Sequence, residues 1–435
     1  MRVLILAELC NPEQPSLPVV GYQYARAIAN HAEVVVATQI RNQSTLQRTG
    51  LGKAEVVFID SEFAARPITS FSAMLRGGTS VSWTIETAMG YPTYLAFEWL
   101  VWQQFKQALH QGEFDLVHRI TPMSPTTPSP IASFSPVPFL IGPLNGNLPW
   151  HADFLAEQRR EREWLSKFRN AYKLLPFARS TYRDSKGILA AFDHTIADLP
   201  PQERPKMINF PEVGIDPALF NPPQRQIRPD QPMTILFAGR LVPYKMPEVV
   251  VRAVANSPLL QKHRLVIVGE GPERIRLEAL IQEYQLEHCV QLLGNQPQSE
   301  VGRLMREAEI FAFPSIRELG AGVVIEAMAC GMACVVVDYG GPATLIGEDR
   351  GIKIPMGKLD FLVHQYTHEL ESLVQDPHRV ANLGAAAYDH AMTYYTWDVK
   401  AQKTLEIYQW ATGQRATKPD FWEGTTPRRM AEANA

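Results

Sequence analysis

Short apolar runs alternate with amphipathic stretches along most of the second half of the chain. Apolar runs bounded by turn-forming residues indicate buried strands, and apolar residues at helical spacing indicate helices that cover a sheet. Strands are predicted at 234–238, 264–268, 290–293, 310–313 and 334–337, with helices at 247–255, 273–284, 299–308 and after Gly322. This regular alternation predicts a doubly wound α/β domain with a parallel sheet.

The first half shows the same alternation in a less regular form. Strands are predicted at 3–6, 34–37 and 56–59, with a helix at 22–29. We therefore predict an α/β protein with two doubly wound, Rossmann-like domains. Two such domains would face each other across a central cleft, and clefts between domains are common ligand sites.

Proline-rich segments indicate where the domains are divided. The segment 199–232 contains nine prolines, and proline fixes φ and lacks an N–H donor, so a domain boundary is predicted there. A second proline-rich segment, 121–149, predicts loops at strand ends. The predicted parts are an N-terminal domain over 1–205, a linker over 206–232, a C-terminal domain over 233–395, a helix at about 396–412 that crosses back to the first domain, and a loose tail over 415–435.

Composition narrows the class of protein. The chain has 435 residues, 46% of them hydrophobic and 20% charged, which excludes a disordered, collagen-like or coiled-coil protein. A net charge of −3 gives no general attraction to nucleic acid, so no such partner is expected. The apolar runs are too short to span a membrane. Four scattered cysteines and no secretory signal favour a cytoplasmic location with reduced thiols.

A strand–loop–helix junction in the second half is the strongest candidate for a binding site. The strand is expected to end near Phe313 and the helix to begin near Gly322, so free N–H groups and the positive end of a helix dipole meet there. Glu318 and Glu326 flank this junction. On one helix they would lie ~12 Å apart, which exceeds the ~5–9.5 Å of a hydrolytic glycosidase pair. The spacing suits two ends of one extended ligand with a phosphate group between them.

Two cations follow the first strand of the same domain. Arg240 and Lys245 lie in the loop after 234–238. A planar guanidinium and a compact ammonium together suit a diphosphate group. Alone, such a pair is more often an ordinary surface feature, so its significance depends on the neighbouring motifs.

Taken in order, these motifs resemble those of family-4 glycosyltransferases, the retaining, nucleotide-sugar-dependent group with the GT-B fold. The matching pieces are Gly239-Arg240-Leu241 with Lys245, Val268-Gly269-Glu270-Gly271-Pro272-Glu273, Leu293-Gly294, the E-x7-E spacing of Glu318 and Glu326 continued by Ala327-Met328-Ala329-Cys330-Gly331, and Gly340-Gly341-Pro342. The resemblance covers nearly all of the second half.

The resemblance implies a role for each site residue. Arg240 and Lys245 would bind the diphosphate, Glu318 would contact the donor sugar near its anomeric carbon, and Glu326 would hold the ribose hydroxyls. The residues that would line the donor through their backbone are Gly269, Gly294, Gly320, Ala321 and Gly322. The loop reads Glu318-Leu319-Gly320-Ala321-Gly322 where the family commonly has E-G-F-G-L, so its glycines are displaced by one position.

The first half carries fewer matching residues. His118 occupies the first position of a His-x-His pair that faces the donor in many family members, and Ile120 occupies the second. His118 is therefore either a site residue or a structural histidine at a strand end. The acceptor-side loop after the first strand, which usually has paired glycines, retains Gly21 as its best candidate.

The resemblance implies transfer of a sugar from a nucleotide diphosphate sugar to an acceptor hydroxyl, with retention, in polysaccharide or glycoconjugate assembly. No cofactor or metal is expected, and His364 and His368 lack the further ligands of a zinc motif. Two other functions stay open: a nucleotide-sugar epimerase on the same fold, and a nucleotide-sugar-binding protein without turnover. A dinucleotide enzyme is disfavoured, because Arg274 replaces the third glycine of its fingerprint.

Two segments leave open a peripheral contact with the inner face of a membrane. Residues 91–110 are rich in aromatic side chains, and residues 157–186 are rich in lysine and arginine. Aromatic and basic faces can together hold a protein on an anionic membrane. The alternative interpretation is a core-facing aromatic stripe and a solvated basic helix.

Overall fold

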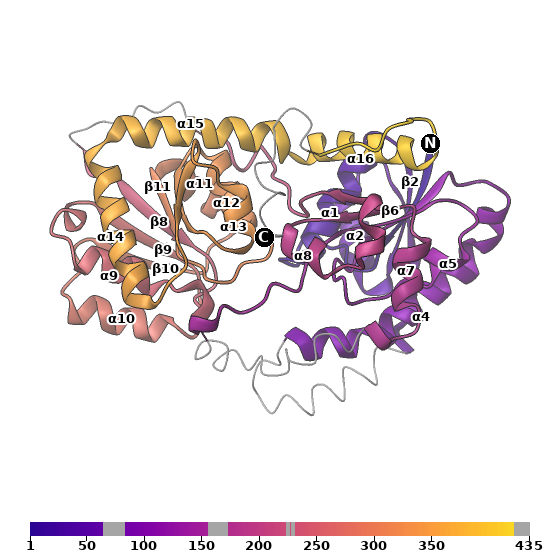
Figure 1. Ribbon diagram of the computed structural model, residues 1–435, viewed down its shortest axis with the longest axis horizontal. Helices are drawn as coiled ribbons and strands as arrows, with labels where there is room; N and C mark the ends of the chain where they lie inside the picture. Colours follow the sequence, from indigo (N-terminus) through magenta and orange to yellow (C-terminus); the bar gives the residue numbers. More distant parts are fainter. Residues whose placement is uncertain (64–82, 155–172, 223–226, 228–230, 422–435) are drawn as a thin grey trace. The chain divides into compact units, whose positions relative to one another are not determined.

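The computed structural model describes residues 1–63, 83–154, 173–222, 227 and 231–421. The chain divides into two compact units. The first comprises Met1–Asn147, Glu163–Glu212 and Trp397–Ala435, and the second comprises Leu148–Arg162 and Val213–Thr396. Each unit is built on one parallel sheet with helices packed on it, so the predicted class of two Rossmann-like α/β domains is confirmed (Figure 1).

The first unit contains a seven-stranded sheet, counted over its described residues, with the order β3-β2-β1-β4-β5-β6-β7. Its strands are β1 (Arg2–Ala7), β2 (Glu33–Gln39), β3 (Glu55–Ile59), β4 (Leu116–Thr121), β5 (Phe139–Leu144), β6 (Gly187–Ala190) and β7 (Met207–Asn209). In the parallel register, Leu4 lies opposite Val35 on one side and Val117 on the other. All three side chains are buried, because a parallel sheet is covered on both faces.

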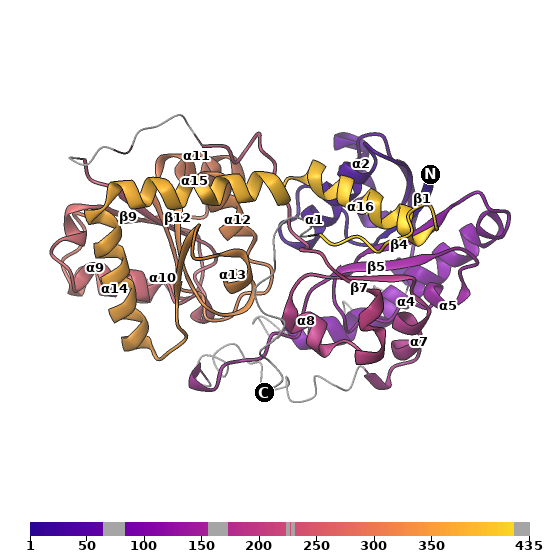
Figure 2. The ribbon, with the colours of Figure 1, turned by 45° about the horizontal axis from the view of Figure 1, so that its top comes forward.

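Helices α1 (Leu17–Ile28) and α16 (Trp397–Ala411) pack together in the first unit, although they come from opposite ends of the chain (Figure 2). A hydrogen bond of 2.6 Å joins the hydroxyls of Tyr24 and Thr404 between them. Among the described residues, the other α-helices of this unit are α2 (Gln43–Thr49), α4 (Trp83–His110), α5 (Ile131–Phe134), α7 (Ala178–Asp184) and α8 (Asp193–Asp198).

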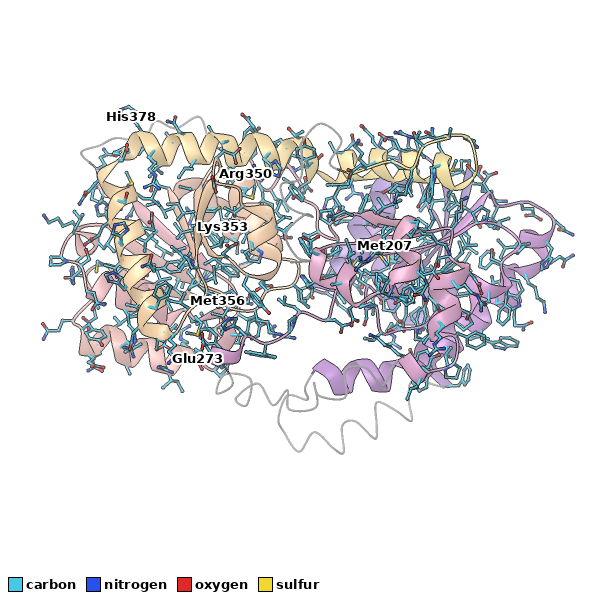
Figure 3. The ribbon with its side chains drawn as sticks, in the orientation of Figure 1. Met207, Glu273, Arg350, Lys353, Met356 and His378 are labelled. Carbon is cyan, nitrogen blue, oxygen red and sulfur yellow. The ribbon has the colours of Figure 1, made fainter. Side chains whose placement is uncertain are left out.

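The second unit contains a six-stranded sheet with the order β10-β9-β8-β11-β12-β13 in its described part. Its strands are β8 (Thr234–Ala238), β9 (Arg264–Val268), β10 (Val290–Gly294), β11 (Ile310–Phe313), β12 (Ala333–Val337) and β13 (Gly351–Ile354). Its helices are α9 (Glu248–Ala255), α10 (Arg274–Glu283), α11 (Gln298–Glu307), α12 (Gly322–Ala329), α13 (Gly340–Leu345), α14 (Leu359–Gln375) and α15 (Pro377–Tyr394). The edge strand β13 carries Lys353, whose Nζ lies 3.2 Å from Asp338 (Figure 3). A charged side chain on an edge strand discourages pairing with other chains.

Two predicted loop segments contain strands instead. Within 121–149, β5 lies between β4 and β6, and its ladder with β6 shifts register between Ile141 and Leu144. Pro143 lies in this irregular stretch, which is why a strand with a proline can be central. Within 206–232, β7 pairs with β6 as an edge strand, so the linker begins after Asn209.

The predicted loose tail is also partly ordered by packing. Phe421 is 2% exposed and its ring centroid lies 5.0 Å from that of Phe210. Lys418 Nζ donates to the carbonyls of Pro205 and Met207, at 2.9 and 2.8 Å (Met207 is labelled in Figure 3). Residues 415–421 therefore belong to the first unit, and the remainder of the tail, 422–435, lies outside the described residues.

Candidate functional site

The second sheet has a topological switch point between β8 and β11. From β8 the chain builds outward through β9 and β10 on one side, and from β11 it builds outward through β12 and β13 on the other. In open parallel sheets, ligands bind in the crevice outside the carboxyl ends of the strands at this point. The two loops that leave these strands are 239–246 and 314–321, and together they carry Arg240, Lys245 and Glu318.

An ion pair lies at this edge of the sheet. Lys245 Nζ is 2.7 Å from Glu318 Oε2, and the two side chains are only 9% and 20% exposed. The Lys245 ammonium also lies 4.7 Å from the centroid of the Phe313 ring, at the end of β11. The structure therefore brings together two of the predicted site residues, one able to neutralise a phosphate oxygen and one able to accept a hydrogen bond from a hydroxyl.

Tyr244 joins the two loops. Its hydroxyl accepts a hydrogen bond of 2.7 Å from Arg240 Nη2. Its carbonyl accepts hydrogen bonds from the Ile316 N–H at 2.9 Å and the Ser315 hydroxyl at 3.4 Å. Tyr244 therefore holds the Arg240 side chain within the same loop that carries Lys245.

The loop that carries Glu318 rests on two glycines. The Gly341 N–H donates to the Glu318 carbonyl at 2.9 Å. A Cβ on Gly340 would lie 2.5 Å from the Glu318 carbonyl oxygen, and a Cβ on Gly341 would lie 2.3 Å from that of Leu319. Because neither position has room for a side chain, the glycine pair at the start of α13 allows the Glu318 loop to pack directly against the backbone of α13.

The glycines predicted to line the donor bring the ends of β8, β9 and β10 together. Gly269 has φ +138°, and a Cβ there would lie 1.9 Å from the Gly239 carbonyl oxygen. Its N–H donates to the Gly294 carbonyl at 2.8 Å, and the Gly239 N–H donates to the Val268 carbonyl at 2.9 Å. Gly269 and Gly294 therefore have a structural role at this edge, and a role in ligand contact stays a prediction.

Helix α12 begins at Gly322, as predicted, after Ala321 in the left-handed conformation with φ 48°. Glu326 projects from the second turn of α12 and accepts a hydrogen bond of 3.4 Å from Gln298 Nε2, at the start of α11. Burial of the carboxyl raises the pKa of Glu326 to about 7, and the bond from Gln298 opposes this rise. A carboxyl that titrates near neutrality is common at functional sites.

The C-terminal region matches a known family. Residues 221–390 match the family described as "Glycosyl transferases group 1". The chain is also similar to curated relatives named D-inositol 3-phosphate glycosyltransferase: 31% identity over 231 residues in Stackebrandtia nassauensis and 30% over 241 residues in Kineococcus radiotolerans. These matches cover 49% of this chain in both cases, and 51% and 53% of the relatives. The chain thus spans about half the length of the curated relatives it matches.

Solved structures agree in fold across nearly the whole chain. Sucrose-phosphate synthase from Thermosynechococcus elongatus has a TM-score of 0.62 at 18% identity, with coverage of 95% of this chain and 100% of that protein. Anabaena HepE in complex with UDP has a TM-score of 0.63 at 16% identity, with coverage of 93% and 99%. At such identities the likeness concerns the fold, and it supports the predicted GT-B class.

His118 lies in the interior of the first unit. It has no exposed surface, and its Nδ1 and Nε2 lie 2.7 Å from the Tyr408 hydroxyl and 2.8 Å from the Gly142 carbonyl. A carbonyl only accepts, so Nε2 carries the proton and Nδ1 accepts from the hydroxyl. Burial lowers the pKa of His118 to about 3. Of the two roles left open by the sequence, this geometry favours the structural one.

Gly21 lies in α1, beside the switch point of the first sheet between β1 and β4. A Cβ on Gly21 would lie 2.2 Å from the Leu9 carbonyl oxygen, so α1 packs directly on the residues that follow β1. Glu8, which is not among the residues predicted from the sequence, directly follows β1. Burial raises the pKa of Glu8 to about 7, against the opposing effects of Arg41 and a hydrogen bond with Gln39. An acidic residue immediately after a buried strand is the signal that could have identified it.

Two further observations concern ligands and membranes. In the part of the chain that the structure describes, His, Cys, Asp and Glu side chains do not gather in groups of three or more that could hold a metal ion. No helix within the described ranges has the length and apolar character needed to cross a bilayer.

Proposed function

We propose that the protein transfers a sugar from a nucleotide diphosphate sugar to an acceptor hydroxyl, with retention at the anomeric carbon, in polysaccharide or glycoconjugate assembly. The observation that carries this proposal is the Lys245–Glu318 pair, with Arg240 in the same loop as Lys245, at the switch point of a region that matches the group 1 glycosyl transferases. The names of the curated relatives support glycosyl transfer, and the complex of HepE with UDP supports a nucleotide donor.

The chemistry of such a transfer needs stabilisation of the leaving group. Negative charge builds on the diphosphate as its bond to the sugar breaks, and fixed cations that face this charge lower the barrier. Arg240 offers a fork of N–H donors and Lys245 a point charge, while the first turn of α12 adds backbone N–H groups and a favourable dipole. Glu318 is assigned to the donor sugar and Glu326 to the ribose hydroxyls. The two cations supply the neutralising charge, and independence from metals stays a prediction.

The activity test uses product analysis. The protein is incubated with UDP, GDP, ADP and dTDP sugars, with and without simple glycoside acceptors, and the products and their anomeric configuration are determined. Glycosyl transfer with retention supports the proposal. An epimerised donor sugar formed without any acceptor identifies the epimerase alternative, and binding without any product identifies the non-catalytic one.

Two variants test the assigned roles. Lys245→Met should lower kcat/KM by about 10²–10³, because loss of one preorganised donor costs ~2.7–4 kcal/mol of transition-state stabilisation. Lys262→Met is the matched control, since Lys262 is exposed in the same unit and lies before the first residue of β9 rather than at the carboxyl end of a strand. Glu318→Gln should lower kcat more than it raises KM. If Lys245→Met and Lys262→Met behave alike, the assignment is wrong.

The ionisation of Glu326 makes a separate test. The carboxylate is the form that accepts hydrogen bonds from two ribose hydroxyls, and burial raises its pKa to about 7. Donor affinity should therefore increase as the pH rises from 6 to 8, and Glu326→Gln should weaken donor binding and remove this pH dependence. An unchanged pH profile in the variant would remove Glu326 from the ribose site.

We also propose that the first unit contacts an anionic membrane surface. Large apolar side chains are exposed on α4, α5 and the segment before α7: Trp99 (57%), Phe134 (42%), Leu174 (86%) and Phe177 (38%). The rings of Trp102, Phe134 and Phe177 form a connected row, with centroid distances of 5.9 and 5.8 Å. Exposed cations lie on the same elements: Lys106 on α4, Lys173 before α7, and Arg179 and Arg183 on α7. Two of them also pair with acidic residues, Lys173 with Asp198 and Arg183 with Asp184. Exposed apolar side chains together with cations on the same elements suit an anionic membrane.

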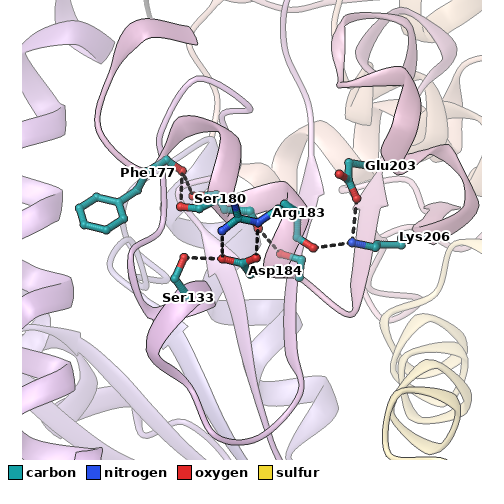
Figure 4. A network of polar contacts seen from close by, with 9 residues as sticks. Ser133, Phe177, Ser180, Arg183, Asp184, Glu203 and Lys206 are labelled. Atoms are coloured by element: carbon teal, nitrogen blue, oxygen red, sulfur yellow. Dashed lines mark hydrogen bonds and ion pairs between the residues drawn. The ribbon is translucent and has the colours of Figure 1, made fainter.

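Polar contacts fix the helices that present the apolar patch (Figure 4). Arg183 donates to both oxygens of Asp184, at 2.7 and 2.9 Å, and the Ser133 hydroxyl of α5 donates to the same carboxylate at 2.7 Å.

Within residues 91–110, Phe97 and Phe105 are buried and belong to the core. The predicted basic segment lies outside the described residues from 157 to 172.

Vesicle sedimentation tests the membrane contact. The double variant Phe134→Ser/Phe177→Ser should bind phosphatidylglycerol vesicles less than the wild type, and neither protein should bind phosphatidylcholine vesicles appreciably. Ile275→Ser/Phe361→Ser is the control, because Ile275 (79% exposed) and Phe361 (41%) are apolar residues of the second unit that are about as exposed as Phe134 and Phe177, or more so. Equal sedimentation of the two double variants would refute the assignment.

The cleft between the domains and the cytoplasmic location stay predictions.

A further inference from the structure

The segment Leu148–Phe154 packs on the carboxyl edge of the second sheet and belongs to the second unit. Tyr339 lies two residues after the end of β12, and its hydroxyl donates to the Pro149 carbonyl at 2.9 Å. Leu148 is 2% exposed, and its Cδ2 would lie 2.8 Å from a Cβ on Gly340. The segment is therefore anchored on the same glycine that supports the Glu318 loop.

Trp150 contacts both loops of the candidate site. The Arg317 guanidinium carbon lies 5.0 Å from the centroid of the indole ring, a cation–π contact. The Tyr244 ring meets the indole edge-on, with centroids 6.5 Å apart and an angle of 86° between the planes. Arg317 and Tyr244 directly precede Glu318 and Lys245, so Trp150 touches the chain neighbour of each member of the ion pair.

Tyr244 connects Trp150 to Arg240. Its side chain is exposed, but its Nη2 donates to the Tyr244 hydroxyl at 2.7 Å. Because an exposed arginine samples many rotamers, a ligand that recruits its guanidinium must pay for ordering it unless a neighbour has already restricted it. Tyr244 supplies that restriction, and the edge contact with Trp150 restricts the ring of Tyr244.

We propose that Trp150 is a positioning residue for the diphosphate group of the donor: it holds Tyr244 and Arg317 in place and, through the Tyr244 hydroxyl, orients Arg240. This inference rests on the proposed function, since it assumes that Arg240 and Lys245 bind a diphosphate. The chemistry concerned is the pyrophosphate unit that all nucleotide diphosphate sugars share, and not the base or the sugar.

The test is a double-mutant cycle on the full chain, with pyrophosphate as the titrant and the dissociation constant measured by calorimetry. Trp150→Leu should weaken pyrophosphate binding about tenfold, and Trp150→Phe should retain most of the affinity because an aromatic edge is preserved. Tyr244→Phe keeps the ring and removes the hydroxyl that accepts from Arg240, so it should produce a similar loss with little change in the melting midpoint. In an Arg240→Gln background, Trp150→Leu should have less than about twofold further effect, because coupled residues are not additive.

The cycle separates this inference from the proposed function. If the wild type binds neither pyrophosphate nor UDP, GDP or ADP, the proposed function fails and the inference fails with it. If Lys245→Met abolishes binding but folded Trp150→Leu and Tyr244→Phe bind as the wild type does, the inference alone is overturned. Fully additive losses for Trp150→Leu and Arg240→Gln would also overturn it. Trp410→Leu, a half-buried tryptophan of the first unit, is the folding control and should leave the affinity unchanged.

Discussion

The two parallel sheets share an architecture, but their switch points are built differently. At the second sheet, glycine backbones approach so closely that a Cβ on Gly269 would lie 1.9 Å from the Gly239 carbonyl oxygen, and charged side chains lie at the edge. At the first sheet, ionisable side chains such as His118 and Arg119 are fully buried. Close backbone packing at a sheet edge requires glycines, and these can be recognised in the sequence. A buried structural histidine or arginine looks the same in the sequence as a catalytic one, and only the structure shows its surroundings.

The buried polar residues of the first unit shape a loop. Arg119 donates to the carbonyls of Ser124 and Thr127, the former at 3.4 Å, and its guanidinium lies 5.5 Å from the centroid of the Tyr94 ring. Glu98 accepts hydrogen bonds from Ser129 and, at 3.1 Å, from Tyr94, and burial raises the pKa of Glu98 to about 7. Such networks specify one conformation because each unpaired group would be costly. The proline-rich stretch after β4 is therefore held by side chains of the core.

The largest predicted difference between the two units concerns glycine substitutions. Gly269→Ala should destabilise the second unit by about 3 kcal/mol or more, since the new Cβ overlaps a backbone carbonyl and φ is +138°. Gly50→Ala in the first unit should cost only about 1 kcal/mol, because φ is +69° but nothing lies within 4 Å of the new Cβ. Urea unfolding of both variants measures the difference. Equal losses would mean that close backbone packing is not what distinguishes the second sheet.

A substitution of His118 tests whether the first unit's polar residues are structural. His118→Ala leaves the Gly142 carbonyl and the Tyr408 hydroxyl without their partner, which should cost about 2 kcal/mol of stability. Turnover per folded molecule should stay within twofold of the wild type. A stable variant with strongly reduced kcat would instead place His118 in the active site and remove the contrast between the two sheets.

Lys400 should make the stability of the first unit depend on pH. Its ammonium is buried in α16, 4.2 Å from the Phe210 ring centroid, and donates to the Pro211 carbonyl. Burial lowers the pKa of Lys400 to about 7, against the opposing charge of Glu212. Between pH 7 and the usual lysine pKa near 10.5, the unfolded chain binds a proton that the folded chain does not, so stability should rise with pH. Lys400→Met should flatten this rise, as measured by urea unfolding at pH 7 and 9, and an unchanged slope would contradict the assignment.

The smallest predicted effect concerns the loop before α12. Ala321 is 1% exposed and has φ 48°, a conformation that costs a non-glycine residue about 1–2 kcal/mol. Ala321→Gly should relieve this cost, and the greater flexibility of glycine in the unfolded chain should offset part of the gain. A net stabilisation below about 1 kcal/mol is expected from urea unfolding. A destabilised variant would show that the buried methyl group matters more than the backbone.

The sequence predicted the second unit better than the first for physical reasons. Its strands β8, β9 and β11 have the predicted bounds because each is an apolar run, preceded by one polar residue in β8 and β9, that ends at a glycine or a proline. Ala321 occupies the place of the second glycine of the E-G-F-G-L pattern and adopts the left-handed conformation, with φ 48°.

Other features could not be read from the sequence. Strand β5 contains Pro143, and β7 is three residues long between prolines, so neither shows the pattern of a typical strand. Tyr244 and Trp150 are nearly a hundred residues apart in sequence, and only the fold brings their rings together. The burial of His118 depends on Tyr408 of α16, which comes from the far end of the chain.

The central claim is that the carboxyl edge of the second sheet binds the diphosphate of a nucleotide sugar. The most direct test is calorimetric titration of the full chain with the nucleoside diphosphate that binds most tightly among UDP, GDP and ADP, using the wild type, Lys245→Met and Glu318→Gln. A charge-assisted hydrogen bond contributes about 1.5–3 kcal/mol, so Lys245→Met should weaken binding by roughly 10- to 100-fold. Glu318→Gln, which is assigned to the sugar, should bind within about threefold of the wild type. Unweakened binding by a folded Lys245→Met variant would contradict the account.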